Sequence, residues 1–116
     1  MSLRFCLAAA ALLAAPSAAF AVNTGGAEFT AVIAASGKIK GGSGVGSVIR
    51  VATGVYQMTF PRFVDTCAAF VSLNDAPGFV FASTLTENTA LIQAKTFDAK
   101  GKPKSLAFSV LIKCQD

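Results

Sequence analysis

The chain has 116 residues, of which 53% are hydrophobic and 14% are charged, with ten Lys and Arg against six Asp and Glu. It contains three cysteines but no histidine and no tryptophan. A chain of this length supports one domain with a modest core. The absence of histidine excludes Ser-His and Cys-His nucleophiles, a histidine general base and the common zinc sites.

The amino terminus has the pattern of an export signal. One positive charge precedes an uncharged apolar run at residues 5–15, and Ala-Phe-Ala at 19–21 fits the cleavage pattern of small residues. We predict a signal peptide over residues 1–21 and a mature chain that begins at Val22, with Ala19 as the alternative cut. The apolar run is too short to span a bilayer, which needs about 20 residues, so no stable membrane anchor is expected after cleavage.

The predicted mature chain, residues 22–116, is expected to form a single β domain with a net charge of +3, from nine Lys and Arg against six Asp and Glu. Cys6 would leave with the signal, so only Cys67 and Cys114 remain. A pair of cysteines in a short exported domain predicts one disulfide. Closing so long a loop would stabilise the fold by about 4 kcal/mol on the chain-entropy estimate.

Alternation of apolar and polar residues indicates β-strands along the mature chain. Tyr56, Met58 and Phe60 recur at the period of two that a half-buried strand requires, and Pro61 ends the run because proline cannot donate to a sheet ladder. No helical period is evident after residue 22. We expect a short edge strand between residues 36 and 46, and strands over 29–35, 47–52, 55–60, 66–73, 79–85, 89–97 and 104–114.

Turn residues separate these runs and define the fold class. Thr-Gly at 53–54 predicts a tight turn, and Asn-Asp-Ala-Pro-Gly at 74–78 predicts a hairpin. Cys114 shares the parity of Phe108 and Ile112, which places the disulfide within or beside the core. Seven or eight short strands predict an all-β fold, a small antiparallel β-sandwich or barrel with one disulfide, preceded by the signal-peptide helix.

No catalytic or metal site is recognisable. The glycine-rich run at 41–46 resembles a phosphate loop, but Ser47 stands where the third glycine is required and no Gly-Lys-Ser/Thr follows. Most carboxylates fall at predicted turns, where they ordinarily accept backbone hydrogen bonds, and no pair has a recognisable glycosidase setting. We therefore expect no enzyme activity, no metal and no cofactor. The carboxylates considered are Glu28, Asp65, Asp75, Glu87 and Asp98.

The phenylalanines are predicted to fill the core. With no Trp and only Tyr56, a platform for stacking sugar rings is disfavoured. The phenylalanines spaced as strand residues are Phe60, Phe63, Phe70, Phe79, Phe81, Phe97 and Phe108.

Several short motifs stand in an order that resembles a known type of small domain. GSGV at 42–45, Ser-Val at 47–48 and TGVYQMTF at 53–60 precede Cys67, and a second cysteine lies near the carboxyl end. This run resembles a small β domain of uncharacterised exported bacterial proteins, which also occurs at the ends of some phage-tail-like proteins. The resemblance implies an exported β module that acts by binding or as structure, and it assigns no catalytic residue.

The expected function is non-catalytic binding of a protein or a polyanionic envelope polymer by a secreted or periplasmic module. Because loops on a rigid sheet carry specificity, the candidate contacts are cationic loop residues. The alternatives are a small inhibitor of an extracellular hydrolase and an assembly subunit that pairs through an edge strand. Nucleic acid is not an expected partner. The candidate binding residues are Lys38, Lys40, Arg62, Lys100, Lys102 and Lys104.

Overall fold

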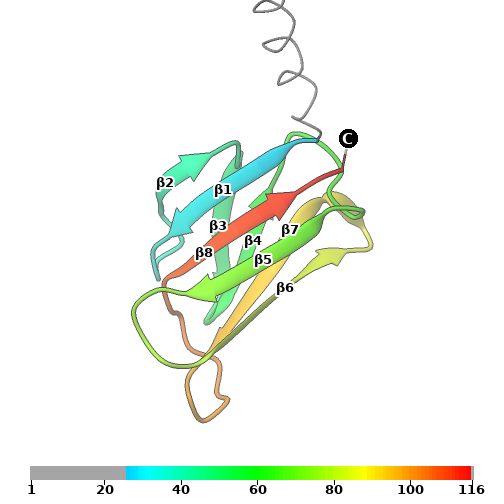
Figure 1. Cartoon of the computed structure of the whole chain (residues 1–116). Helices are drawn as coiled ribbons and strands as arrows, with labels where there is room; N and C mark the ends of the chain where they lie inside the picture. Colours follow the sequence, from blue (N-terminus) through cyan, green and yellow to red (C-terminus); the bar gives the residue numbers. More distant parts are fainter. Residues whose placement is uncertain (1–25, 116) are drawn as a thin grey trace, which may run out of the picture.

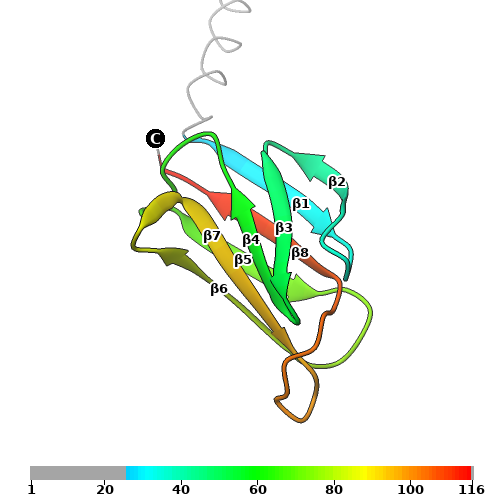
Figure 2. The same cartoon turned by 180° about the vertical axis from the view of Figure 1, so that it is seen from behind.

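The computed structural model describes residues 26–115, which form two four-stranded antiparallel β-sheets packed face to face (Figures 1 and 2). The predicted signal peptide lies outside the described residues. The strands are β1 (Glu28–Ile33), β2 (Ile39–Ser43), β3 (Ser47–Ala52), β4 (Val55–Thr59), β5 (Ala68–Leu73), β6 (Phe79–Leu85), β7 (Asn88–Phe97) and β8 (Phe108–Lys113).

The two sheets have the strand orders β2-β1-β8-β5, here called sheet A, and β3-β4-β7-β6, here called sheet B. In sheet A the central strands β1 and β8 pair from Glu28 with Lys113 to Ile33 with Phe108. In sheet B the central strands β4 and β7 pair from Val55 with Lys95 to Thr59 with Leu91. The fold is therefore an antiparallel β-sandwich, which is one of the two architectures that the sequence predicts.

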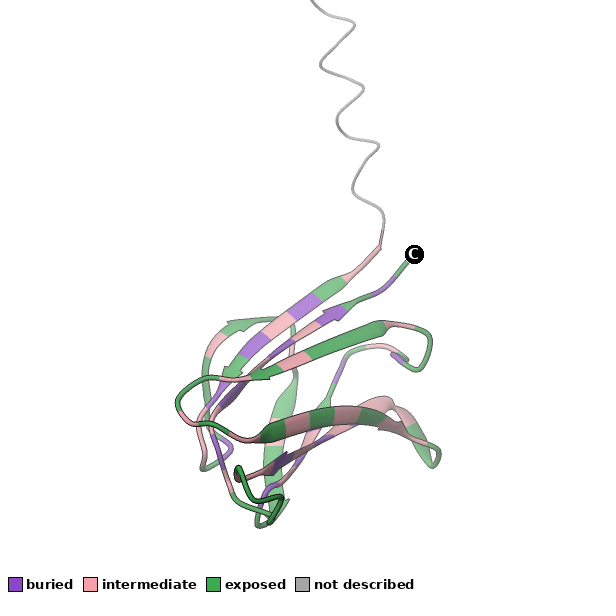
Figure 3. Ribbon diagram, turned by 60° about the horizontal axis from the view of Figure 1, so that its bottom comes forward, coloured by how far each residue is buried: buried purple, intermediate pink, exposed green. Residues whose placement is uncertain are grey.

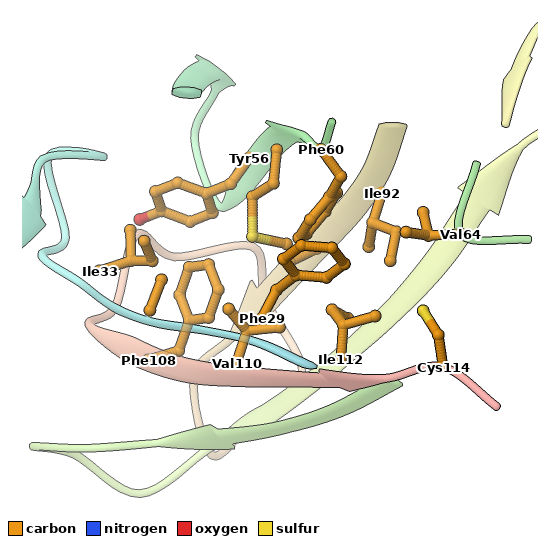
Figure 4. Close-up of a cluster of buried hydrophobic side chains, with 13 residues drawn as sticks. Phe29, Ile33, Tyr56, Phe60, Val64, Ile92, Phe108, Val110, Ile112 and Cys114 are labelled. Carbon is orange, nitrogen blue, oxygen red and sulfur yellow. The ribbon is translucent and has the colours of Figure 1, made fainter. Parts of the chain in front are cut away.

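The core lies between the sheets. Every second side chain of the central strands points into it. Tyr56 on β4 faces Phe108 on β8 (Figure 4), and Met58 and Ile112 belong to the same cluster; all four are fully buried. The Tyr56 and Phe108 rings meet edge to face with centroids 5.0 Å apart. Along the central strands β1, β4, β7 and β8, buried residues alternate with more accessible ones, whereas the edge strands contain no buried residue (Figure 3). Each fully buried side chain of this size stabilises the fold by about 1.5–3 kcal/mol.

The predicted disulfide is present. Cys67, just before β5, and Cys114, just after β8, are joined with their Cα atoms 4.4 Å apart. Cys114 is buried and belongs to the core cluster, as its parity with Phe108 and Ile112 predicts. Because β5 and β8 are neighbours in sheet A, the bond ties two adjacent strands at one end of the sandwich, here called the disulfide end.

Two predicted elements differ from the structure. Residues 74–78 form a connection between the sheets and not a hairpin, because β5 pairs with β8 whereas β6 pairs with β7. Residues 104–107 also cross between the sheets, so the last strand begins at Phe108. Asn, Pro and Gly specify that the chain turns, but the partner of the next strand is decided by which apolar faces cover the core.

The assignment of the phenylalanines to the core is wrong for four of them. The exposed fractions are 68% for Phe63, 59% for Phe70, 59% for Phe79 and 48% for Phe81. The outward position of Phe79 and Phe81 follows from parity, since Val80 and Ala82 are the residues of β6 that pack against the core. Phe60 and Phe108 are buried as predicted.

Candidate binding surface at the basic end

Three turns meet at the end of the sandwich opposite the disulfide, where β1 passes to β2, β3 to β4 and β7 toward β8 (Figure 1). The Gly54 N–H donates to Ser105 Oγ at 3.0 Å, which joins the β3–β4 turn to the segment that enters β8. The Tyr56 hydroxyl donates to the Ala35 carbonyl at 2.6 Å, so a side chain of sheet B holds the β1–β2 turn of sheet A. These bonds hold the turns as one surface.

Exposed cations gather on this surface, here called the basic end. Lys38 lies in the β1–β2 turn, Arg50 lies near the end of β3, and Lys100, Lys102 and Lys104 lie in and just after the hairpin of residues 98–103. All five residues are exposed. Like charges held on adjacent turns sum to a local positive potential that attracts anions over about one Debye length, near 8–10 Å at physiological salt.

The two carboxylates at the basic end offset this charge only in part. Asp75 lies in the connection at 74–78, and Asp98 begins the hairpin. Asp98 Oδ1 accepts hydrogen bonds from the backbone N–H groups of Lys100, at 2.9 Å, and Lys102, at 3.0 Å. The predicted turn role of Asp98 is thus confirmed, and its carboxylate orders the lysine-bearing loop.

The hairpin is tied to the core through Thr96. Its buried hydroxyl donates to the Lys104 carbonyl at 2.5 Å and accepts the Leu106 N–H at 3.3 Å. Beside the hairpin lies a hollow of about 310 Å³. Its lining combines two lysines and one carboxylate with apolar residues, namely Ala76, Pro77, Asp98, Ala99, Lys100, Lys104 and Leu106. The hollow thus has apolar walls, with the two lysines and the Asp98 carboxylate at its edge.

The structure separates the predicted binding residues into two groups. It brings Lys38, Lys100, Lys102 and Lys104 to the basic end, although more than 60 residues separate the first from the others. Lys40 is exposed on β2, two residues after Lys38. Arg62 lies at the disulfide end, where its Nε donates to the Phe63 carbonyl at 2.9 Å, so it cannot share a contact surface with the lysines.

Sequence reasoning missed two cations near the basic end. Arg50 approaches the β1–β2 turn, where its Nη1 donates to the Ala35 carbonyl at 3.3 Å. Lys95 is opposite Val55, the first residue after the β3–β4 turn, and lies on the outer face of sheet B. The signal was available, because both residues stand within three positions of a predicted turn.

A second surface feature lies at the disulfide end. A hollow of about 420 Å³ is lined by Phe60, Pro61, Arg62, Phe63 and Ala90. Buried Val64 fixes the segment, since its N–H donates to the Thr89 carbonyl at 2.8 Å and its carbonyl accepts the Cys67 N–H at 3.1 Å. The exposed ring of Phe63 is therefore presented by a loop with a well-anchored backbone.

Within residues 26–115, no group of three or more His, Cys, Asp or Glu side chains is placed to hold a metal ion. The same residues include no helix that is long and apolar enough to cross a membrane. The arrangement at the basic end can attract and bind anionic groups through exposed ammonium and guanidinium donors.

The fold and the basic end together define a disulfide-linked β-sandwich with a cationic loop surface. Comparisons with protein-family profiles, with curated proteins and with solved structures find no match for the chain.

Proposed function

We propose that the protein is an exported, non-catalytic binding module that holds an anionic polymer at its basic end. The observation that carries the proposal is the convergence of Lys38, Arg50 and the lysines of the 98–104 segment on one surface, with only Asp75 and Asp98 as acidic residues there among the described residues. Polymers with closely spaced negative charges bind such surfaces by releasing condensed counterions.

Two observations support the proposed compartment. The disulfide between Cys67 and Cys114 is consistent with an oxidising environment. The first 21 residues have the charge, apolar run and small residues of a signal peptide. The resemblance to a small β domain of exported bacterial proteins agrees with both. Periplasmic or extracellular anionic polymers are the partners that this location makes available.

The proposal is tested by binding to long-chain polyphosphate, a polymer of high charge and simple structure. The K100Q/K102Q variant lowers the charge of the basic end by two and should weaken binding on the order of tenfold at 50 mM NaCl. Binding of the unmodified protein should fall steeply between 50 and 300 mM NaCl, because screening acts on exposed charges. Isothermal titration calorimetry measures both effects.

The matched control is T66E/Q115E, which also lowers the net charge by two but changes exposed residues at the disulfide end. Its polyphosphate affinity should stay within about twofold of the unmodified protein, since the added charges lie a full strand length from the lysines. Equal losses in the two variants would mean that net charge alone determines binding, and the basic end would then not be the binding surface.

A second candidate function, inhibition of an extracellular hydrolase, is favoured by the loop at 60–67. This loop presents Phe63 at 68% exposure while Val64 beneath it is buried and hydrogen-bonded. Rigid loops with an exposed anchor are typical of protein interfaces. Inhibition assays against trypsin, subtilisin and lysozyme, repeated with Phe63→Ala, test it. If none of the three enzymes is inhibited by the unmodified protein, this candidate loses its support.

A further inference from the structure

The outer face of sheet B carries an unusual number of exposed apolar side chains. Of the eight large hydrophobic residues that are exposed within residues 26–115, four lie there, and these are Ile49, Val51, Phe79 and Phe81. The two pairs lie on opposite edge strands of the sheet, and the phenylalanine pair on β6 is the candidate contact surface, because exposed apolar residues are normally scattered singly.

The register of the strands places an aromatic group at one corner of this face. Phe79 on β6 is opposite Phe97 on β7, and Phe81 is opposite Lys95, which in turn is opposite Val55 on β4. The rings of Phe81 and Phe97 lie nearly parallel, at an interplanar angle of 8°, with centroids 6.0 Å apart. The corner thus holds three rings, two of them stacked on each other, with Lys95 on the strand beside Phe81.

A row of polar side chains crosses the same face beside the aromatic corner. Ser83, Gln93 and Gln57 occupy successive strands at one level, and Gln57 Nε2 donates to Gln93 Oε1 at 3.3 Å. That bond uses one donor and one acceptor, so both amides keep further groups that can bind hydroxyls.

The face is continuous with the basic end. Phe97 pairs with Pro103, which stands between Lys102 and Lys104, so the aromatic corner adjoins the lysine-bearing hairpin. A chain held at the hairpin could pass directly onto Phe97, Phe81 and Lys95. The three kinds of group on this route are cations, aromatic rings and amides.

From this juxtaposition we propose that the anionic polymer is an acidic polysaccharide, whose sugar rings pack on Phe79 and Phe81 while its acid groups meet Lys95 and the basic end. The inference rests on the proposed function and names its ligand class. The apolar faces of sugar rings fit aromatic surfaces, and their hydroxyls fit the Gln57–Gln93 pair. A polyphosphate has no ring and would leave the aromatic corner uncovered.

The main competing occupant is a second copy of the chain. Stacking two sheet B faces about a two-fold axis would bring Lys95 of each copy into a shared apolar interface. Two like charges taken out of water in this way oppose association. An acidic ligand instead pairs with Lys95, so charge complementarity favours the polysaccharide.

The experiment compares four polymers with the unmodified protein and two variants. The probes are polygalacturonate and dextran sulfate as acidic polysaccharides, polyphosphate as a ringless polyanion, and dextran as a neutral polysaccharide. F79A/F81A should weaken binding of at least one acidic polysaccharide on the order of tenfold, from the loss of two aromatic contacts, and should change polyphosphate binding by less than about twofold. Dextran should bind far more weakly than either acidic polymer.

The control variant is Phe70→Ala, which removes a ring of the same 59% exposure as Phe79 from the outer face of sheet A. It should leave all affinities unchanged. Perturbation of the Gln57 and Gln93 side-chain amide signals in NMR spectra by the acidic polysaccharide, and not by polyphosphate, would place the ligand on sheet B independently of folding effects in the variants.

The outcomes separate this inference from the proposed function. If K100Q/K102Q weakens every anionic polymer while F79A/F81A weakens none, the basic end stands as the binding surface and the polysaccharide inference is overturned. If the unmodified protein binds no anionic polymer, the proposed function itself fails. If light scattering shows a dimer that F79A/F81A converts to a monomer, the face is a self-interface and the inference is likewise overturned.

Discussion

At the scale of single residues, Thr96 is a buried polar side chain whose hydroxyl makes two hydrogen bonds. It is fully buried, and its hydroxyl serves both the Lys104 carbonyl and the Leu106 N–H. Thr96→Val keeps the shape but leaves the buried Leu106 N–H and the part-buried Lys104 carbonyl without their partner. We expect the free energy of unfolding to fall by about 1–3 kcal/mol, measured by urea denaturation. The lysine hairpin should loosen as well, because Thr96 is one of its ties to sheet B.

The matched control for this prediction is Thr59→Val, which makes the same change at an exposed position of β4. Its stability should remain within about 0.5 kcal/mol of the unmodified protein. Thr96→Ser, which retains a hydroxyl, should recover part of the lost stability. Equal urea midpoints for the two valine variants would show that the Thr96 hydrogen bonds contribute nothing net.

At the scale of elements, β2 depends on one of its two adjacent glycines. Gly42 has a φ of +112°, and a Cβ added there would lie 2.2 Å from the Thr30 carbonyl oxygen of β1. Gly42→Ala would force β2 away from β1, and we expect a loss of at least about 2 kcal/mol in the free energy of unfolding. Thermal and urea unfolding followed by circular dichroism measure the loss.

Gly41 provides the control, because a Cβ at that position would meet no atom within 4 Å. Gly41→Ala should therefore be neutral or slightly stabilising, since alanine restricts the unfolded chain. A loss of stability in Gly41→Ala equal to that in Gly42→Ala would refute the idea that close approach to β1 selects the glycine.

Elements that depend on local pattern could be predicted from the sequence, whereas pairing across the molecule could not. The alternation of Tyr56, Met58 and Phe60 gave the buried face of β4 correctly, because period two is a property of the strand itself. The connection at 74–78 was predicted as a hairpin, because turn residues do not encode whether the next strand joins the same sheet or the opposite one. The outward rings of Phe79 and Phe81 violate the expectation that large apolar residues are buried.

For the candidate surface too, the local pattern predicts individual residues but not how the fold brings them together. The lysines at 38, 100, 102 and 104 could be selected from the sequence because they stand in or beside polar turns. That they share one end, and that Arg62 does not, is a consequence of the sandwich topology. Lys95 was overlooked because it lies within a strand, where the outer face of a sheet can present a charge as well as a loop can.

At the scale of the whole molecule, the disulfide and the cationic surface lie at opposite ends of the sandwich. The Cys67–Cys114 bond closes a sequence separation of 47 residues at the disulfide end, and the basic end carries the cations. C67A/C114A should lower the free energy of unfolding by about 4 kcal/mol on the chain-entropy estimate, a large part of the 5–15 kcal/mol typical of a small domain. Urea denaturation of the variant, and of the unmodified protein reduced with dithiothreitol, should give similar midpoints.

The same variant tests whether the two ends are independent. Under conditions where C67A/C114A remains folded, its affinity for polyphosphate should equal that of the unmodified protein, because the turns of the basic end are held by Gly54, Tyr56 and Thr96 and not by the disulfide. Titration at 15 °C, with the folded fraction checked by near-ultraviolet circular dichroism, measures this. A weakened affinity in the fully folded variant would mean that the disulfide organises the cationic surface as well as the core. The constraint of the disulfide would then pass through both sheets to the opposite end.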